Sequence, residues 1–148
     1  MLRFTSSLNP KSDAFAIFAS ESYTYKNKHN ILSKAIIEKI DSFLKTIKEK
    51  KGKDEINYFD ISSKQKCFII KVKSKHNSYY PEEIGGVFFS HLKKIKNLNN
   101  IDLYFDSLNY DKDKLIKFSS EFMLGFNLKS YTFNKYKTVD KEKFNKKI

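Results

Sequence analysis

The run AFAIFAS, from Ala14 to Ser20, constrains the fold more than any other part of the sequence. Neighbouring side chains of a β-strand point to opposite faces of the sheet, and this run is apolar at almost every position. A strand with one face in water alternates apolar and polar residues, whereas a strand covered on both faces does not. The run therefore predicts a central strand with helices on both faces of its sheet.

Strands and helices are expected to alternate along the chain. Runs rich in β-forming residues predict further strands at Leu2 to Ser6, Ile56 to Ile61, Lys66 to Lys73 and Ile101 to Asp106. Apolar residues at helical spacing predict helices at about Ile31 to Glu49, from Pro81, and after Asp111. This order indicates an α/β fold: a single layered domain with a mixed, mostly parallel central sheet flanked by helices.

Local signals place the ends of these helices. Asn30 can cap the first helix, Pro81 opens the second where its missing N–H costs nothing, and Asp111 can cap the third. Residues Lys129 to Thr138 are expected to be extended or irregular. The third helix is expected to turn four apolar side chains inward: Leu115, Phe118, Phe122 and Phe126.

Length and composition indicate one globular domain with a modest core. The chain has 148 residues, of which 40% are hydrophobic and 16% aromatic, which argues against global disorder. No apolar run is long enough to span a bilayer, and the start lacks the apolar stretch of a signal peptide. Cys67 is the one cysteine, so no disulfide can form within the chain, and a cytoplasmic location is expected.

The formal net charge of +12 leaves two interpretations open. A strongly basic chain is typical of proteins that bind nucleic acid or anionic surfaces. Alternatively, an AT-rich genome enriches Lys, Asn, Ile and Phe, and charge supports a binding function only where it clusters. Because the lysines are spread along the chain, the second interpretation is favoured.

Candidate chemical groups are scattered. His29, His76 and His91 are not spaced with other ligands in a metal-binding pattern. Cys67 lies in a predicted buried strand without an activating neighbour, and it is interpreted as a packing residue. The sequence thus predicts no catalytic residue and no residue that binds a cofactor or a metal.

Two adjacent pairs in the second predicted helix have structural explanations. Glu82 and Glu83 diverge on a helix, so they suit the positive end of its dipole better than a shared catalytic site. Gly85 and Gly86 lack the further glycines or the lysine of a phosphate loop, and close approach to a sheet explains them better. An ADP-ribose-like nucleotide ligand remains an alternative by analogy of fold alone.

Near the C-terminus, aromatic residues alternate with lysines. Such a pattern can stack bases and neutralise phosphates, or the aromatic rings can pack inside while the lysines stay in water. The second interpretation predicts that Phe133 is buried against the third helix near Phe122 or Phe126. The residues concerned are Lys129, Tyr131, Phe133, Lys135, Tyr136 and Lys137.

The segment LGFNLKSYTFNKYKT, from Leu124 to Thr138, resembles the end of the N-terminal domain of the cytosol (leucyl) aminopeptidase family. In that family a helix runs into a segment of the form Gly-x-x-Leu-x-Ser-Tyr-x-Phe-x-Lys-Tyr-Lys-Thr. Two positions depart from the pattern: Leu124 stands where Glu often precedes the glycine, and Lys129 where a second glycine is common. The matching positions are Gly125, Leu128, Ser130, Tyr131, Phe133, Lys135, Tyr136, Lys137 and Thr138.

The resemblance implies a non-catalytic assembly or regulatory domain that is similar to macro domains in fold. Residues 1–138 would form this domain, and residues 139–148 would begin the linker to a catalytic domain. Family members are hexamers that use two divalent ions, such as zinc or manganese, in the catalytic domain. The implied partners are that catalytic domain and further copies of the same chain, with no membrane. The alternative is a basic module that binds nucleic acid weakly and without sequence preference.

Overall fold

The computed structural model describes residue 9 and residues 11–51 and 53–145, with side chains described up to Tyr131. The strand expected at Leu2 to Ser6 lies outside the described residues. The contacts divide the chain into two compact units. One comprises residues 1–75 and 97–115, and the other comprises residues 76–96 and 116–148.

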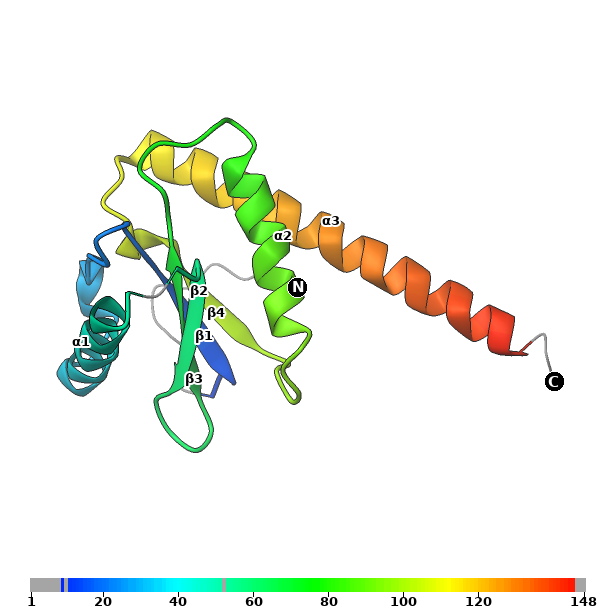
Figure 1. The fold of residues 1–148 in the computed structure, drawn as a ribbon, viewed down its shortest axis with the longest axis horizontal. Helices are drawn as coiled ribbons and strands as arrows, with labels where there is room; N and C mark the ends of the chain where they lie inside the picture. Colours follow the sequence, from blue (N-terminus) through cyan, green and yellow to red (C-terminus); the bar gives the residue numbers. More distant parts are fainter. Residues whose placement is uncertain (1–8, 10, 52, 146–148) are drawn as a thin grey trace. The chain divides into compact units, whose positions relative to one another are not determined.

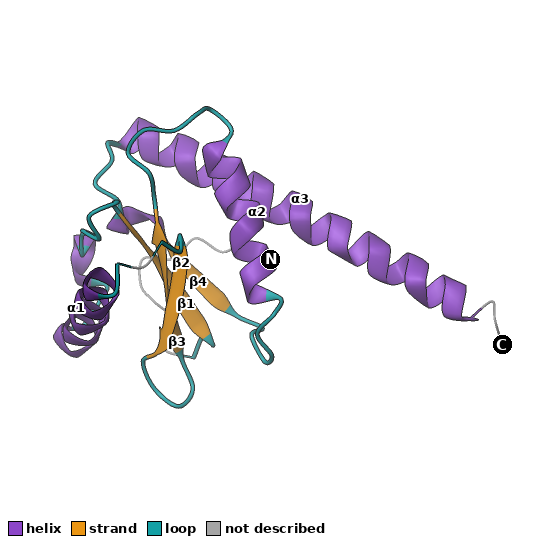
Figure 2. Cartoon of the chain, viewed as in Figure 1, coloured by secondary structure: helices purple, strands orange, loops and turns teal. Residues whose placement is uncertain are grey.

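A four-stranded sheet forms the first unit (Figures 1 and 2). The strands β1 (Ala14–Ala19), β2 (Ile56–Asp60), β3 (Lys66–Lys71) and β4 (Ile101–Tyr104) lie in the order β2-β3-β1-β4. β1 pairs in parallel with β3 and β4, whereas β2 pairs antiparallel with β3. The predicted α/β class and the mixed, mostly parallel sheet are confirmed.

Both faces of β1 are buried, as the sequence predicts. All six of its residues have no exposed surface. On one face Phe15 and Ile17 belong to a core cluster with Ile40 and Leu44 of helix α1 (Lys34–Glu49). On the opposite face Phe18 stacks on Phe105 with ring centroids 4.7 Å apart. The central strand therefore contributes apolar side chains to two layers.

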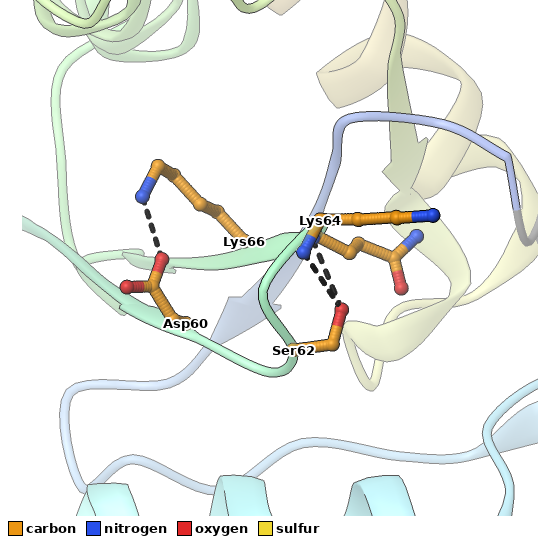
Figure 3. A network of polar contacts seen from close by, with 5 residues as sticks. Asp60, Ser62, Lys64 and Lys66 are labelled. Atoms are coloured by element: carbon orange, nitrogen blue, oxygen red, sulfur yellow. Dashed lines mark hydrogen bonds and ion pairs between the residues drawn. The ribbon is translucent and has the colours of Figure 1, made fainter.

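A tight turn joins β2 to β3 and explains why this pair is antiparallel. The Ser62 side chain accepts the backbone N–H groups of Lys64 and Gln65, at 3.2 and 3.1 Å. Across the strands, Lys66 forms an ion pair with Asp60 at 2.6 Å (Figure 3). A connection this short joins antiparallel neighbours, because parallel strands need a long crossover.

Helix α1 begins later than predicted. Asn30 does not cap it, because Lys28–Asn30 form a short 3₁₀ turn, η1, and Asn30 has a φ of 50°. The cap is Ser33, whose hydroxyl accepts the N–H of Ile36 at 3.3 Å. Asn and Ser are comparably good capping residues, so the choice depends on the path of the preceding loop.

The second unit contains helix α2 (Tyr80–Leu92) and most of helix α3 (Lys112–Asn145). Pro81 and the two glutamates lie in the first turn of α2, as predicted. Asp111 caps α3, because its carboxylate accepts the N–H of Lys114 at 2.8 Å. Phe118 and Phe122 are buried, while Leu115 and Phe126 are half-buried.

Helix α3 runs through the segment that was expected to be extended. Residues from Lys129 to Thr138 are helical, and the helix continues to Asn145 over the first part of the predicted linker. The expectation of an extended or irregular segment is therefore wrong. No proline and no glycine follows Gly125 in α3, so nothing in the sequence interrupts the backbone hydrogen bonds.

Candidate functional site

The carboxyl ends of the parallel strands are the first place to look for a ligand site in this fold. The chain goes from β1 to β3 on one side and then returns to β4 on the other side of β1. In open α/β sheets, ligands bind beyond the carboxyl ends of the strands where the strand order reverses in this way. Here that place lies between the ends of β1 and β4.

Ser107 lies at this place. It belongs to a second 3₁₀ turn, η2 (Phe105–Ser107), where β4 was expected to continue to Asp106, and it has no exposed surface. Its Oγ accepts the N–H of Phe18 at 2.8 Å. The same Oγ lies 2.6 Å from the carbonyl oxygen of Tyr104 and 3.1 Å from that of Phe18, and it donates its one proton to either. The hydroxyl thus provides hydrogen bonds to the backbone at the point where the pairing of β1 with β4 ends.

Ser107→Ala is expected to destabilise the first unit by about 1–3 kcal/mol, because the buried N–H of Phe18 would lose its acceptor. Urea unfolding, followed by circular dichroism, measures the difference. Ser119→Ala serves as the control, since that hydroxyl donates to the carbonyl of Ile116 within its own helix. Equal stability of both variants would contradict the assigned role of Ser107.

The turn after β1 gathers hydroxyl groups around a strained tyrosine. The hydroxyl oxygen of Ser20 lies 3.0 Å from that of Ser22 and 2.5 Å from that of Thr24. Tyr23 has a φ of 59°, in the left-handed region, and is buried. The Lys71 ammonium lies 5.4 Å from the centroid of its ring. These contacts hold the turn against the sheet and give it a structural role.

At the amino end of β1, Asp13 organises the start of β4. Its carboxylate accepts the N–H groups of Asn99 at 2.8 Å and Asn100 at 3.0 Å. These two hydrogen bonds hold the pKa of Asp13 below its ordinary value. Sequence reasoning missed Asp13 and Ser107, because their partners lie far away along the chain and no local motif marks them.

The other polar candidates stay apart from one another. Cys67 is buried in the core of the first unit, and burial raises the pKa of its thiol, which suits a packing residue. His76 stacks on Tyr80, with centroids 4.7 Å apart. His29 lies in η1 and His91 in α2. Among the described residues, no three His, Cys, Asp or Glu side chains gather where they could hold a metal ion.

Glycines bring α2 and α3 into close contact within the second unit. A Cβ on Gly85 would overlap the backbone of Phe122, and one on Gly125 would overlap the backbone of Glu82. The predicted close approach at Gly85 therefore exists, but its partner is a helix rather than a sheet. Gly125, the first residue of the motif from the resemblance, marks the reciprocal contact on α3.

A shallow groove follows this helix contact. Glu82, Glu83 and Gly86 of α2 lie on one side, with Tyr79 just before the helix. The α3 side is formed by Gly125, Leu128 and Lys129. The sequence did not indicate this groove, since it depends on which faces of the two helices meet. It combines apolar side chains, two carboxylates and one ammonium group.

The remaining motif residues lie along α3. Ser130 is half-buried, and Leu128 and Tyr131 are exposed. The side chains of Phe133, Lys135, Tyr136, Lys137 and Thr138 lie outside those that the structure describes, as does the predicted burial of Phe133 near Phe122 or Phe126.

None of the helices in the described part of the chain has an apolar stretch long enough to cross a bilayer. Comparisons with protein-family models, with curated proteins and with solved structures give no match.

Proposed function

We propose that this chain is the non-catalytic N-terminal domain of a metal-dependent leucyl aminopeptidase of the cytoplasm and serves its assembly or regulation. The observation that carries the proposal is the position of Gly125. At this first residue of the motif, α3 comes so close to the backbone of Glu82 that only glycine fits. The motif thus begins at a residue that the packing of two helices requires.

Two further observations support a structural role. The α/β class is compatible with the macro-like domain that the resemblance implies. At the usual ligand position between β1 and β4, Ser107 is buried and its hydroxyl accepts the N–H of Phe18. In the proposed parent enzyme, the catalytic domain would hold two divalent ions such as zinc or manganese. The helical residues beyond Lys129 would lead towards that domain, and further copies of the chain would complete a hexamer.

Association with a catalytic domain tests the proposal. The chain is mixed with a leucyl aminopeptidase catalytic domain produced without its own N-terminal domain, and sedimentation velocity is measured. We expect the two to sediment together. The chain alone should release leucine from a chromogenic amide no faster than zinc, manganese or cobalt in buffer. Metal-dependent turnover by the chain alone, or no association at concentrations up to about 100 μM, would overturn the proposal.

We also propose weak binding to nucleic acid as a second candidate, because exposed lysines gather at the C-terminal end of α1 and just after it. Lys48, Lys50, Lys51 and Lys53 are all exposed within one short stretch. Contacts to about four phosphates predict a slope of about −3.6 for log affinity against log salt concentration, or a loss of about 150-fold between 50 and 200 mM salt. Scrambled duplexes should bind equally well. Fluorescence anisotropy that shows one strongly preferred sequence with little dependence on salt would exclude this candidate.

A further inference from the structure

Apolar side chains form an exposed row on α3 beside the groove of the second unit. Leu124, Leu128 and Tyr131 follow one another at helical spacing, so they share one side of the helix. Their relative exposures are 49%, 49% and 69%. Tyr79, at the start of α2, is also 69% exposed and lines the same groove as Leu128. Several large apolar groups thus face solvent on one side of the helix pair, as at sites of protein association.

The floor of the groove is bare backbone. Gly86 and Gly125 both line the groove, and an added Cβ at Gly86 would lie 3.6 Å from the carbonyl oxygen of Gly125 and 3.9 Å from the Cβ of Lys129. The absence of side chains allows the backbone of another element to come close. Because α2 and α3 are in backbone contact beneath the groove, the side chains of a partner would lie over the groove rather than between the helices.

The two rims carry opposite charge. Glu82 and Glu83 provide two carboxylates on α2, and Lys129 provides an ammonium group on α3. A two-fold axis that runs parallel to the groove places the α2 rim of one copy against the α3 rim of the other. The surface is therefore complementary in charge to itself. Because the chain has a net charge of +12, a second copy can supply lysines to this acidic pair.

We propose that this α2–α3 face binds a second copy of the chain in a two-fold dimer. Leu128 and Tyr131 of one copy lie over the groove of the other, and Glu83 of each copy pairs with Lys129 of the other. The proposal specifies a surface for the assembly role above but rests on the groove alone. The test of the dimer measures self-association, whereas the test of the proposed function measures binding to a catalytic domain.

Sedimentation equilibrium of the full chain between about 5 and 500 μM, at low and moderate salt, measures the dimer directly. Stable interfaces bury about 800 Å² per partner, whereas only a few side chains contribute here, so we expect a weak affinity that this concentration range covers. Leu128→Asp should weaken the dimer at least about 10-fold, since it places two charges in the apolar centre. Ile116→Asp is the matched control, because Ile116 is 54% exposed on α3 but does not line the groove.

A charge exchange distinguishes the proposed pairing from general loss of fold. Glu83→Lys and Lys129→Glu should each weaken dimerisation several-fold, and the double variant should restore it. Thermal unfolding by circular dichroism verifies that each variant is folded. A wild-type chain that is monomeric throughout the concentration range overturns the proposal. So does a dimer that responds equally to Leu128→Asp and Ile116→Asp, or one that the double exchange fails to restore.

Discussion

Replacing Gly125 with alanine is expected to lower the free energy of unfolding by more than about 3 kcal/mol. The new Cβ would overlap the carbonyl group and the Cα of Glu82. Both sides of this contact are helix backbone, so no side-chain rotation can relieve it. The helices would have to move apart, and Phe88 and Phe122, whose ring centroids are 5.9 Å apart, would lose contact.

Gly86→Ala is the matched control for this prediction. Its Cβ would be 3.6 Å from the carbonyl oxygen of Gly125, an ordinary van der Waals distance. Alanine is also favoured over glycine inside a helix by about 0.8–1.0 kcal/mol. Gly86→Ala should therefore preserve or raise stability, while Gly125→Ala lowers it. Urea unfolding of both variants measures the contrast, and equal stabilities would show that α2 and α3 do not meet at Gly125.

The elements that the sequence predicted best are those whose signals are local. The apolar run of β1 was enough to indicate a strand buried on both faces, because neither side of its pleat is polar. Pro81 and Asp111 placed two helix starts correctly, since the geometry of a first turn depends on a few adjacent residues. These residues depend little on what lies elsewhere in the fold.

The elements that were missed depend on distant contacts or on competing local choices. Ser33 rather than Asn30 caps α1, although both residue types are suitable. Ser107 accepts the N–H of Phe18 in β1, a strand that lies far away in the sequence. The segment from Lys129 to Thr138 was expected to be extended or irregular, but it holds no proline or glycine and continues α3.

The candidate site on the second unit illustrates the same limit. Glu82, Gly86 and Leu128 belong to separate sequence features, and only the packing of α2 against α3 brings them together. The pair Gly85–Gly86 did indicate a close approach, because such glycines inside a helix cost stability unless something needs the space. The sequence alone could not show whether a sheet or a second helix approaches these glycines, since either one needs the space that a side chain would occupy.

Phe122→Ala is expected to cost about 3–5 kcal/mol, a large part of the stability of a domain of this size. Phe122 has no exposed surface and lies between two other rings. Its ring centroid is 5.9 Å from that of Phe88 on α2 and 6.1 Å from that of Phe118 one turn earlier on α3. Truncation would leave a cavity between two helices whose backbones are already in contact and cannot move closer.

Leu124→Ala tests whether the loss of stability expected for Phe122→Ala comes from the burial of the ring rather than from the composition of the helix. Leu124 is only two positions away but is 49% exposed, so its truncation should change stability by no more than about 0.5 kcal/mol. Urea unfolding monitored by far-ultraviolet circular dichroism compares the two variants in the same helix. A large loss for Leu124→Ala with a small one for Phe122→Ala would mean that α3 is rotated about its axis. The groove and the dimer face derived from that orientation would then both be wrong, because Leu128 lies on the same side of the helix as Leu124.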